Sequence, residues 1–169
     1  MRLFIRGIPT DEFERLRAGG PDAHGLPPLL RRAEGAANPC RHCLDLIRQG
    51  EPKLVLAHRP FPRPQPYAEC GPIFLHATPC RRYEREALPE WFVFLEPAIV
   101  RGYDADDWIL YETGRVVPGR ALEGACHAIL DDPRVAYVHV RSKFNCFQCR
   151  VDREQEPSRA SSPERGSGR

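Results

Sequence analysis

The chain has 169 residues, of which 41% are hydrophobic, and this suits one globular domain with its own core. The net charge is only +2, from 25 lysines and arginines against 23 acidic residues, so a nucleic-acid or membrane-surface partner is not favoured. No apolar run approaches about 18 residues and the start lacks a signal-peptide pattern, so we expect a cytoplasmic protein that spans no membrane.

The first part of the chain predicts short elements around one long loop. Residues 3–8 predict a strand, and Thr10 followed by acidic and then basic residues predicts a short helix. Residues 18–38 are rich in glycine, proline and alanine, which predicts a long loop. Asn38 is a typical N-cap, and the apolar stripe after it predicts a second helix that ends at Gly50.

Further strands are predicted from apolar or alternating runs. They are, in chain order, residues 53–57, 72–77, 91–95, 108–112 and 135–141. Residues 120–130 place apolar side chains at helical spacing and predict a third helix, whereas the polar stretch 154–169 predicts a disordered tail. The predicted fold class is therefore α+β: a single domain over residues 1–153, with a mixed or mainly antiparallel sheet and about three helices.

Two Cys-x-x-Cys pairs are the strongest chemical signal in the sequence: Cys40 with Cys43, and Cys146 with Cys149. Each pair supplies two thiolates at a spacing that suits a tetrahedral zinc ion. The total of seven cysteines is odd, and in a reducing compartment this favours metal ligation over a disulfide framework. We therefore predict a structural zinc ion bound by all four thiolates, which would clamp the N-terminal third to the last strand.

Other interpretations of the cysteines remain open. A Cys-x-x-Cys pair at a helix start is also typical of a thiol–disulfide oxidoreductase, here centred on Cys40 and Cys43, although those motifs directly follow a buried strand. The two pairs can also be unrelated buried thiols. Cys126 lies on the apolar stripe of the third predicted helix, and we interpret it as a core residue.

A second candidate site combines histidine, arginine and tyrosine. In the alternating run 135–141, Tyr137, His139 and Arg141 share the face opposite three apolar residues. Burial of histidine and arginine costs several kcal/mol unless they are paired, so this face requires partners. His76 lies on the earlier predicted strand 72–77 and is placed to join them if the two strands are neighbours.

These residues predict a pocket for a small anionic molecule. Its expected members are His76, Arg101, Tyr103, Tyr137, His139 and Arg141. In it His139 and His76 would transfer protons, and Arg141 would grip a carboxylate or phosphate. In the alternative interpretation, the arginines form structural ion pairs and His139 is a core histidine. The acids available for such pairs are Glu69, Asp104 and Asp107.

No nucleophile–base spacing in this group matches a known triad, and nothing in the sequence assigns Cys70 or Cys80 as a nucleophile. The sequence thus predicts a small zinc-stabilised protein, either an enzyme or a ligand-binding protein. The alternative is the oxidoreductase that uses Cys40 and Cys43. A zinc-finger adaptor is disfavoured because the charge is nearly balanced.

Five segments, taken together, resemble one known family. They are Pro-Cys-Arg-His-Cys-Leu at 39–44, Gly-Pro-Ile-Phe-Leu-His at 71–76, Arg-Gly-Tyr-Asp at 101–104, Val-His-Val-Arg-Ser at 138–142 and Asn-Cys-Phe at 145–147. In combination they resemble the bacterial family catalogued as domain of unknown function 1203, over roughly residues 1–153. The resemblance implies a single cytoplasmic bacterial domain and assigns no catalytic residues.

Overall fold

The structure is a computed structural model that describes residues 1–154, so the predicted disordered tail lies, after its first residue, outside the described part. The strands are β1 (Leu3–Arg6), β2 (Leu29–Arg32), β3 (Pro52–His58), β4 (Gly71–His76), β5 (Glu84–Arg85), β6 (Ala98–Tyr103), β7 (Arg115–Val117), β8 (Tyr137–Ser142) and β9 (Phe147–Arg153). The helices are α1 (Thr10–Arg17) and α2 (Leu122–Leu130), with the 3-10 helices η1 (Glu90–Phe94), η2 (Tyr111–Thr113) and η3 (Gly119–Ala121).

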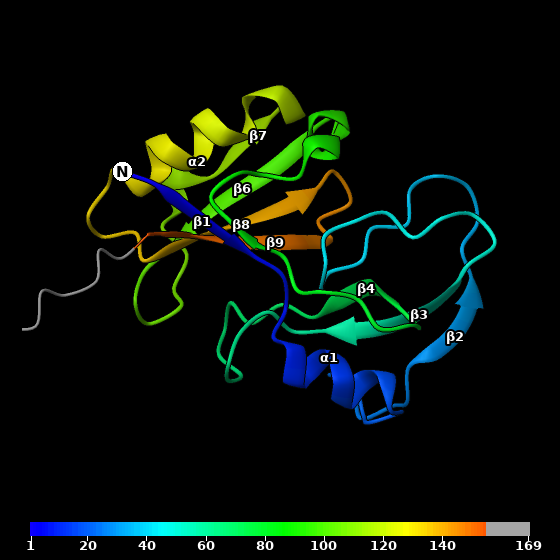
Figure 1. Ribbon diagram of the computed structural model, residues 1–169. Helices are drawn as coiled ribbons and strands as arrows, with labels where there is room; N and C mark the ends of the chain where they lie inside the picture. The colour runs from blue at the N-terminus through cyan, green and yellow to red at the C-terminus, as the bar shows by residue number, and fades with distance from the viewer. Residues whose placement is uncertain (155–169) are drawn as a thin grey trace, which may run out of the picture.

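The strands form two antiparallel sheets. The larger has six strands in the order β5-β1-β9-β8-β6-β7, and the smaller has three in the order β2-β3-β4. From top to bottom, Figure 1 shows α2, the larger sheet, the smaller sheet and α1. The α+β class with antiparallel sheets is therefore confirmed, with two α-helices rather than the expected three.

Among residues 1–154, two of three apolar clusters correspond to these layers, and the third contains Phe61, Tyr103 and Tyr137. The first lies between α2 and the larger sheet and contains Val138 and Val140, both 0% exposed. The second lies between α1 and the smaller sheet and contains Phe13 of the helix and Leu75 of β4. Phe147 of β9 belongs to the second core, so it joins the larger sheet to the smaller one. The opposite face of β8 is buried as well, which places His139 and its neighbours between the two sheets.

The helix predicted from Asn38 to Gly50 is absent, and a tight turn takes its place. Pro39 and Leu46 form an antiparallel bridge across the turn, and Leu44 adopts a positive φ of 56°. The Ile47 N–H donates back to the Asn38 carbonyl at 2.8 Å, so the backbone groups pair across the turn instead of along a helix. The Asn38 N-cap favoured a helix on local grounds, but the backbone hydrogen bonds across the turn outweigh that preference.

Three other predictions of secondary structure were wrong. Residues 91–95 belong to η1 rather than a strand, and 108–112 contribute only an isolated bridge at Ile109 and part of η2. The expected loop 18–38 contains β2, whose four side chains are all exposed and so lack the apolar alternation that marks a strand. Strands β5, β6, β7 and β9 were not predicted either.

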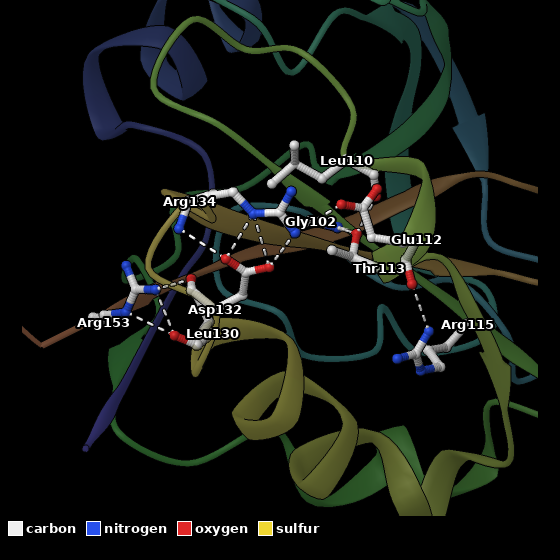
Figure 2. A network of polar contacts seen from close by, with 9 residues as sticks. All are labelled: Gly102, Leu110, Glu112, Thr113, Arg115, Leu130, Asp132, Arg134 and Arg153. Atoms are coloured by element: carbon white, nitrogen blue, oxygen red, sulfur yellow. Dashed lines mark hydrogen bonds and ion pairs between the residues drawn. The ribbon is translucent and has the colours of Figure 1, made fainter.

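A polar network fixes the end of α2 to the last strand (Figure 2). Arg153 Nε donates to the Leu130 carbonyl at 2.8 Å and Arg153 Nη2 to the Asp132 carbonyl at 2.6 Å. The first bond satisfies a carbonyl in the last turn of α2 that the helix end leaves without a partner, whereas Asp132 lies just beyond the helix. Thr113 Oγ1 accepts the Gly102 N–H at 2.8 Å and thereby anchors β6 in the same region. Within the described residues, neither helix is long and apolar enough to cross a membrane.

Candidate metal centre and cleft

Four metal-ligating side chains converge beside α1 and the smaller sheet. They are Cys40, Cys43, His76 and Cys80, whose ligand atoms all lie within 4.8 Å of one another. Cys43 Sγ lies 3.4 Å from His76 Nδ1. Zinc bonds of about 2.3 Å to sulfur and about 2.0 Å to nitrogen give a tetrahedral edge of about 3.5 Å between such atoms. The cluster could therefore bind a metal ion.

The backbone brings these ligands together from two places in the chain. Cys40 and Cys43 lie on the tight turn that replaced the expected helix, and the Arg41 N–H of that turn donates to the Phe74 carbonyl of β4 at 3.0 Å. His76 ends β4, and its own N–H donates to Cys40 Sγ at 3.4 Å. The turn is thus held against the strand that supplies the histidine.

Hydrogen bonds within the cluster shift the pKa values of its members. Burial alone would raise the pKa of Cys40, but hydrogen bonds from Cys43, Cys80 and His76 outweigh it and lower the pKa. Hydrogen bonds to the Cys40 and Cys43 sulfurs raise the pKa of His76 to about 10, and the same two sulfurs raise that of Cys80. The Cys40 thiolate therefore keeps His76 and Cys80 protonated. A divalent cation bound by the cluster would displace those protons.

A second histidine supports the cluster from outside. His42 Nδ1 lies 3.1 Å from Cys80 Sγ, and its Nε2 lies 3.0 Å from Thr10 Oγ1. The ring stacks flat on Phe13, with centroids 4.1 Å apart and planes at 1°. Burial lowers the pKa of His42, so the neutral ring can donate to the sulfur while the Thr10 hydroxyl donates to the other nitrogen.

The second cysteine pair does not join the cluster, which corrects the predicted set of four cysteines. Cys149 points with Val151 into the core under α2 and is 0% exposed, because alternate side chains of β9 face that core. Burial raises its pKa well above the ordinary value. Among the described residues, Cys146 Sγ has only a long hydrogen bond, 3.9 Å to the Phe144 carbonyl. His76 and Cys80 take the places that Cys146 and Cys149 were expected to fill.

Arg41 occupies the space between the two pairs. Its Nε donates to the Phe147 carbonyl of β9 at 2.5 Å, so it connects the turn to the larger sheet. Burial lowers the pKa of Arg41 to about 10, an effect that the sulfurs of Cys146 and Cys40 oppose. The clamp between the N-terminal third and the last strand therefore exists, but a guanidinium forms it. Cys126 lies in the core, as predicted.

The predicted His/Arg pocket is divided among three places. His76 lies in the metal cluster and not beside His139, because β4 and β8 belong to different sheets. Arg101 and Arg141 both pair with Glu69, as the alternative interpretation expected, and the Arg141 Nη1 distance is 2.8 Å. Tyr103, Tyr137 and His139 do come together, on neighbouring strands β6 and β8.

His139 lies in an aromatic box between the sheets. Four rings surround it at centroid distances of 5.2 Å for Phe61, 4.7 Å for Tyr103, 5.0 Å for Tyr137 and 4.9 Å for Phe147. The side chain is 0% exposed, and neither ring nitrogen has a hydrogen-bond partner among the described residues. Burial, and after it the charge of Arg141, hold the pKa of His139 well below its ordinary value. The histidine is therefore neutral.

A cleft of about 370 Å³ adjoins this box. Its charged and aromatic lining residues are Arg6, Glu12, His58, Arg59, Phe61, Arg82, His139, Phe147 and Arg150. A smaller cavity of about 170 Å³ lies next to it and shares His58, Pro60 and Phe147 with it. Sequence reasoning missed Glu12, His58 and Arg59. The available signal was the polar run that directly follows the predicted strand 53–57.

The charges of the cleft are unevenly matched. Arg6 and Arg150 both pair with Asp152, at 2.7 Å each, and Arg82 pairs with an acid outside the lining. Arg59 forms no ion pair within residues 1–154, and its Nε is buried without a hydrogen-bond partner there. His58 Nδ1 lies 3.2 Å from an oxygen of Glu12, the acid that α1 contributes. An excess of positive charge therefore faces the cleft.

A family model matches residues 37–153, which is more than half of the chain. Its description is "Protein of unknown function (DUF1203)". The chain belongs to this family. No curated protein and no solved structure matches the chain. The part of the chain that matches the family contains all four members of the metal cluster, whereas Glu12 and the rest of α1 precede it.

Proposed function

We propose that this protein binds a small anionic ligand in the cleft between its two sheets, and that a structural zinc ion stabilises the walls of that cleft. One observation carries the proposal: among residues 1–154, four arginines and a single carboxylate line a cleft of about 370 Å³. Ligand sites in proteins usually measure about 300–1,000 Å³ and contain a few polar groups of this kind. Arg59, which has no acidic partner within residues 1–154, is the cation with which the ligand pairs.

The proposed roles follow the positions of the side chains. Arg59 binds the anion from the cleft wall, and His139 supplies a neutral imidazole beside it. Arg141 is the anion clamp in the adjoining cavity, and Arg101 acts through the Glu69 that both arginines hold. The box is completed by Tyr103 and Tyr137. His76 takes the role of metal ligand instead of proton transfer.

The donor set favours zinc in a structural role. Three thiolates and one imidazole are soft or borderline ligands that suit zinc, and four protein ligands leave no open position for a substrate. The oxidoreductase alternative explains only Cys40 and Cys43, whereas metal ligation explains all four groups. Cys40 is also 0% exposed, which hinders attack on a partner disulfide.

The metal and the cleft share helix α1. His42 connects Cys80 to Thr10 at the start of the helix, and Glu12 of the same helix lies against His58 in the cleft. Zinc binding therefore fixes the element that supplies the only carboxylate that the described part of the chain contributes to the cleft lining. Structural zinc can contribute on the order of 10 kcal/mol of apparent binding free energy, which is enough to order such an element.

Calorimetry on the zinc-loaded full chain tests ligand binding, with phosphate, sulfate and small carboxylates as the probes. We expect at least one to bind, and Arg59→Gln to weaken that binding about tenfold or more, since it removes a charge-assisted contact. Arg120→Gln is the matched control, because Arg120 is 78% exposed and lines neither cavity. If none of the probes binds, or if both variants bind equally, the proposal fails.

Elemental analysis with thiol counting tests the metal. We expect one zinc per chain and protection of the three cluster thiols, those of Cys40, Cys43 and Cys80, from alkylation. A metal-free protein in which Cys40 and Cys43 cycle between thiols and a disulfide would instead support the oxidoreductase.

A further inference from the structure

The geometry points to a ligand with two anionic groups: one lies in the larger cleft, the other in the smaller cavity, and His58 contacts the segment between them. This inference rests on the proposed function and specifies its ligand class. The smaller cavity, at about 170 Å³, is below the usual size of a complete ligand site. It adjoins the larger cleft through shared lining residues, so it fits one end of a longer molecule.

Arg141 gives the smaller cavity its preference for an anion. The side chain is only 3% exposed, and its Nη1 donates to Glu69 Oε2 at 2.8 Å and to the Asn145 carbonyl at 3.1 Å. Its Nε and Nη2 are buried and have no hydrogen-bond partner among the described residues. These two nitrogens form one edge of the guanidinium, the fork that binds two oxygens of a carboxylate or phosphate.

The carboxylate in this cavity does not cancel that preference. Glu69 is held by two arginines, Arg141 and Arg101, and also accepts a hydrogen bond from Asn145 Nδ2 at 3.1 Å. Its single negative charge is therefore shared between two positive ones. A buried guanidinium edge without a partner is destabilising, and an oxyanion bound to it would offset that cost.

The larger cleft provides the second cationic position. Arg59 lines this cleft and not the smaller cavity, and its Nε is likewise buried without a partner among residues 1–154. Two guanidinium groups with unused donors thus lie in two adjoining cavities. One small anion cannot occupy both cavities, whereas a molecule with an oxyanion at each end can.

His58 stands where the two cavities meet. It lines both of them, is 6% exposed, and has its Nδ1 held 3.2 Å from Glu12. Because Glu12 holds Nδ1, the other ring nitrogen, Nε2, is the one that contacts the ligand. The middle of the ligand therefore carries a group that an imidazole nitrogen can hydrogen-bond, such as a hydroxyl or an ester oxygen.

Calorimetry on the zinc-loaded full chain compares one-headed with two-headed probes. The one-headed probes are acetate and inorganic phosphate, and the two-headed probes are malate, which carries two carboxylates, and 3-phosphoglycerate, which carries a carboxylate and a phosphate. We expect a two-headed probe to bind at least about 100-fold more tightly than either one-headed probe, because its second contact is intramolecular. The two probes also distinguish a carboxylate from a phosphate at the second end.

Variants assign the two ends. Arg141→Lys keeps the charge but removes the fork, and together with Arg59→Gln it should bring the affinity for the two-headed probe down to the one-headed level. His58→Gln should weaken the two-headed probe only. Arg120→Gln, on an exposed arginine outside both cavities, should change nothing.

A second measurement does not depend on the folding of the variants. Cys146 lines the smaller cavity, so its alkylation by iodoacetamide, followed by mass spectrometry, should slow when the two-headed probe is bound. Equal affinities for both probe types together with unprotected Cys146 would overturn the inference and leave the proposed function standing. If no probe binds at all, the proposed function itself fails.

Discussion

Tyr103 and Tyr137 stack with ring centroids 5.2 Å apart and planes at 13°, but their hydroxyls differ. The Tyr137 hydroxyl donates to Asp107 Oδ1 at 2.7 Å, whereas the buried Tyr103 hydroxyl has no partner among the described residues. Burial, and then the Asp107 carboxylate, raise the pKa of Tyr137, so it stays a donor at ordinary pH. The Tyr137 hydroxyl should therefore contribute to stability, whereas the Tyr103 hydroxyl should not.

The same substitution should give different results at these positions. Tyr137→Phe leaves the buried Asp107 carboxylate without a donor and should cost about 1–3 kcal/mol of unfolding free energy. Tyr103→Phe removes a hydroxyl that bonds to nothing in the described chain, so the change should stay within about 0.5 kcal/mol or be stabilising. Urea unfolding measures both. Equal losses would mean that the Tyr103 hydroxyl has a partner of its own.

Substitution of the cysteines and His76 separates the two sets of metal ligands. His76→Ala and Cys80→Ser should lose the metal and about 3 kcal/mol or more of stability, because structural zinc contributes directly to folding. Cys146→Ser should keep one metal per chain, since Cys146 lies outside the cluster. Elemental analysis after dialysis against a chelator, followed by urea unfolding, gives both quantities. Loss of metal from Cys146→Ser with retention in His76→Ala would restore the four-cysteine site.

His42 should tune the metal without binding it. His42→Phe preserves a flat ring against Phe13 but removes the nitrogen that lies 3.1 Å from Cys80 Sγ. Loss of such outer contacts typically reduces metal affinity 10–100-fold, and we expect about that decrease in a competition titration with a chromophoric chelator. The cobalt-loaded protein should also show a shifted sulfur-to-metal absorption band. Thr10→Val, which removes only the outer partner, should weaken binding less. If the metal affinity and the spectrum are unchanged, the contact between His42 and Cys80 contributes only to packing.

Local patterns predicted those parts of the fold that depend on neighbours in sequence. The alternation in β8 correctly placed Tyr137, His139 and Arg141 on one face, and the Cys-x-x-Cys spacing of Cys40 and Cys43 correctly marked two ligands. Both features follow from the geometry of a few consecutive residues. The α+β fold class was predicted from local patterns of the same kind.

The other half of the metal cluster depends on tertiary structure. His76 and Cys80 are separated by only three residues, a spacing that carries little signal, and their role follows from the contact between the Cys40 turn and β4. Cys149 had the better motif but occupies a strand position that faces the core. Residues 98–103 of β6 alternate in burial over their first four positions, but Ile99 is apolar on the less buried face, so the sequence shows no apolar–polar period that could reveal the strand.

The buried His139 should make folding sensitive to acid. Burial, and then Arg141, Arg150, His58 and Arg101, hold its pKa well below the ordinary value, so the folded chain keeps it neutral. In the unfolded chain the pKa of His139 is about 6.5. As the pH falls below that value, only the unfolded state takes up this proton. The stabilising contribution is therefore complete above about pH 6.5 and decreases below it by about 1.4 kcal/mol per pH unit until the folded pKa is reached.

Comparison with His139→Gln isolates this contribution, because the metal cluster titrates in both proteins and cancels in the difference. Unfolding free energies measured in urea between about pH 7.5 and 5 should fall less steeply for the variant, by about one proton's worth of slope at the acidic end. His24→Gln, at an exposed histidine, is the control and should follow the wild type. Parallel curves for wild type and His139→Gln would show that His139 takes up its proton equally in both states, and the neutral histidine of the aromatic box would have to be abandoned.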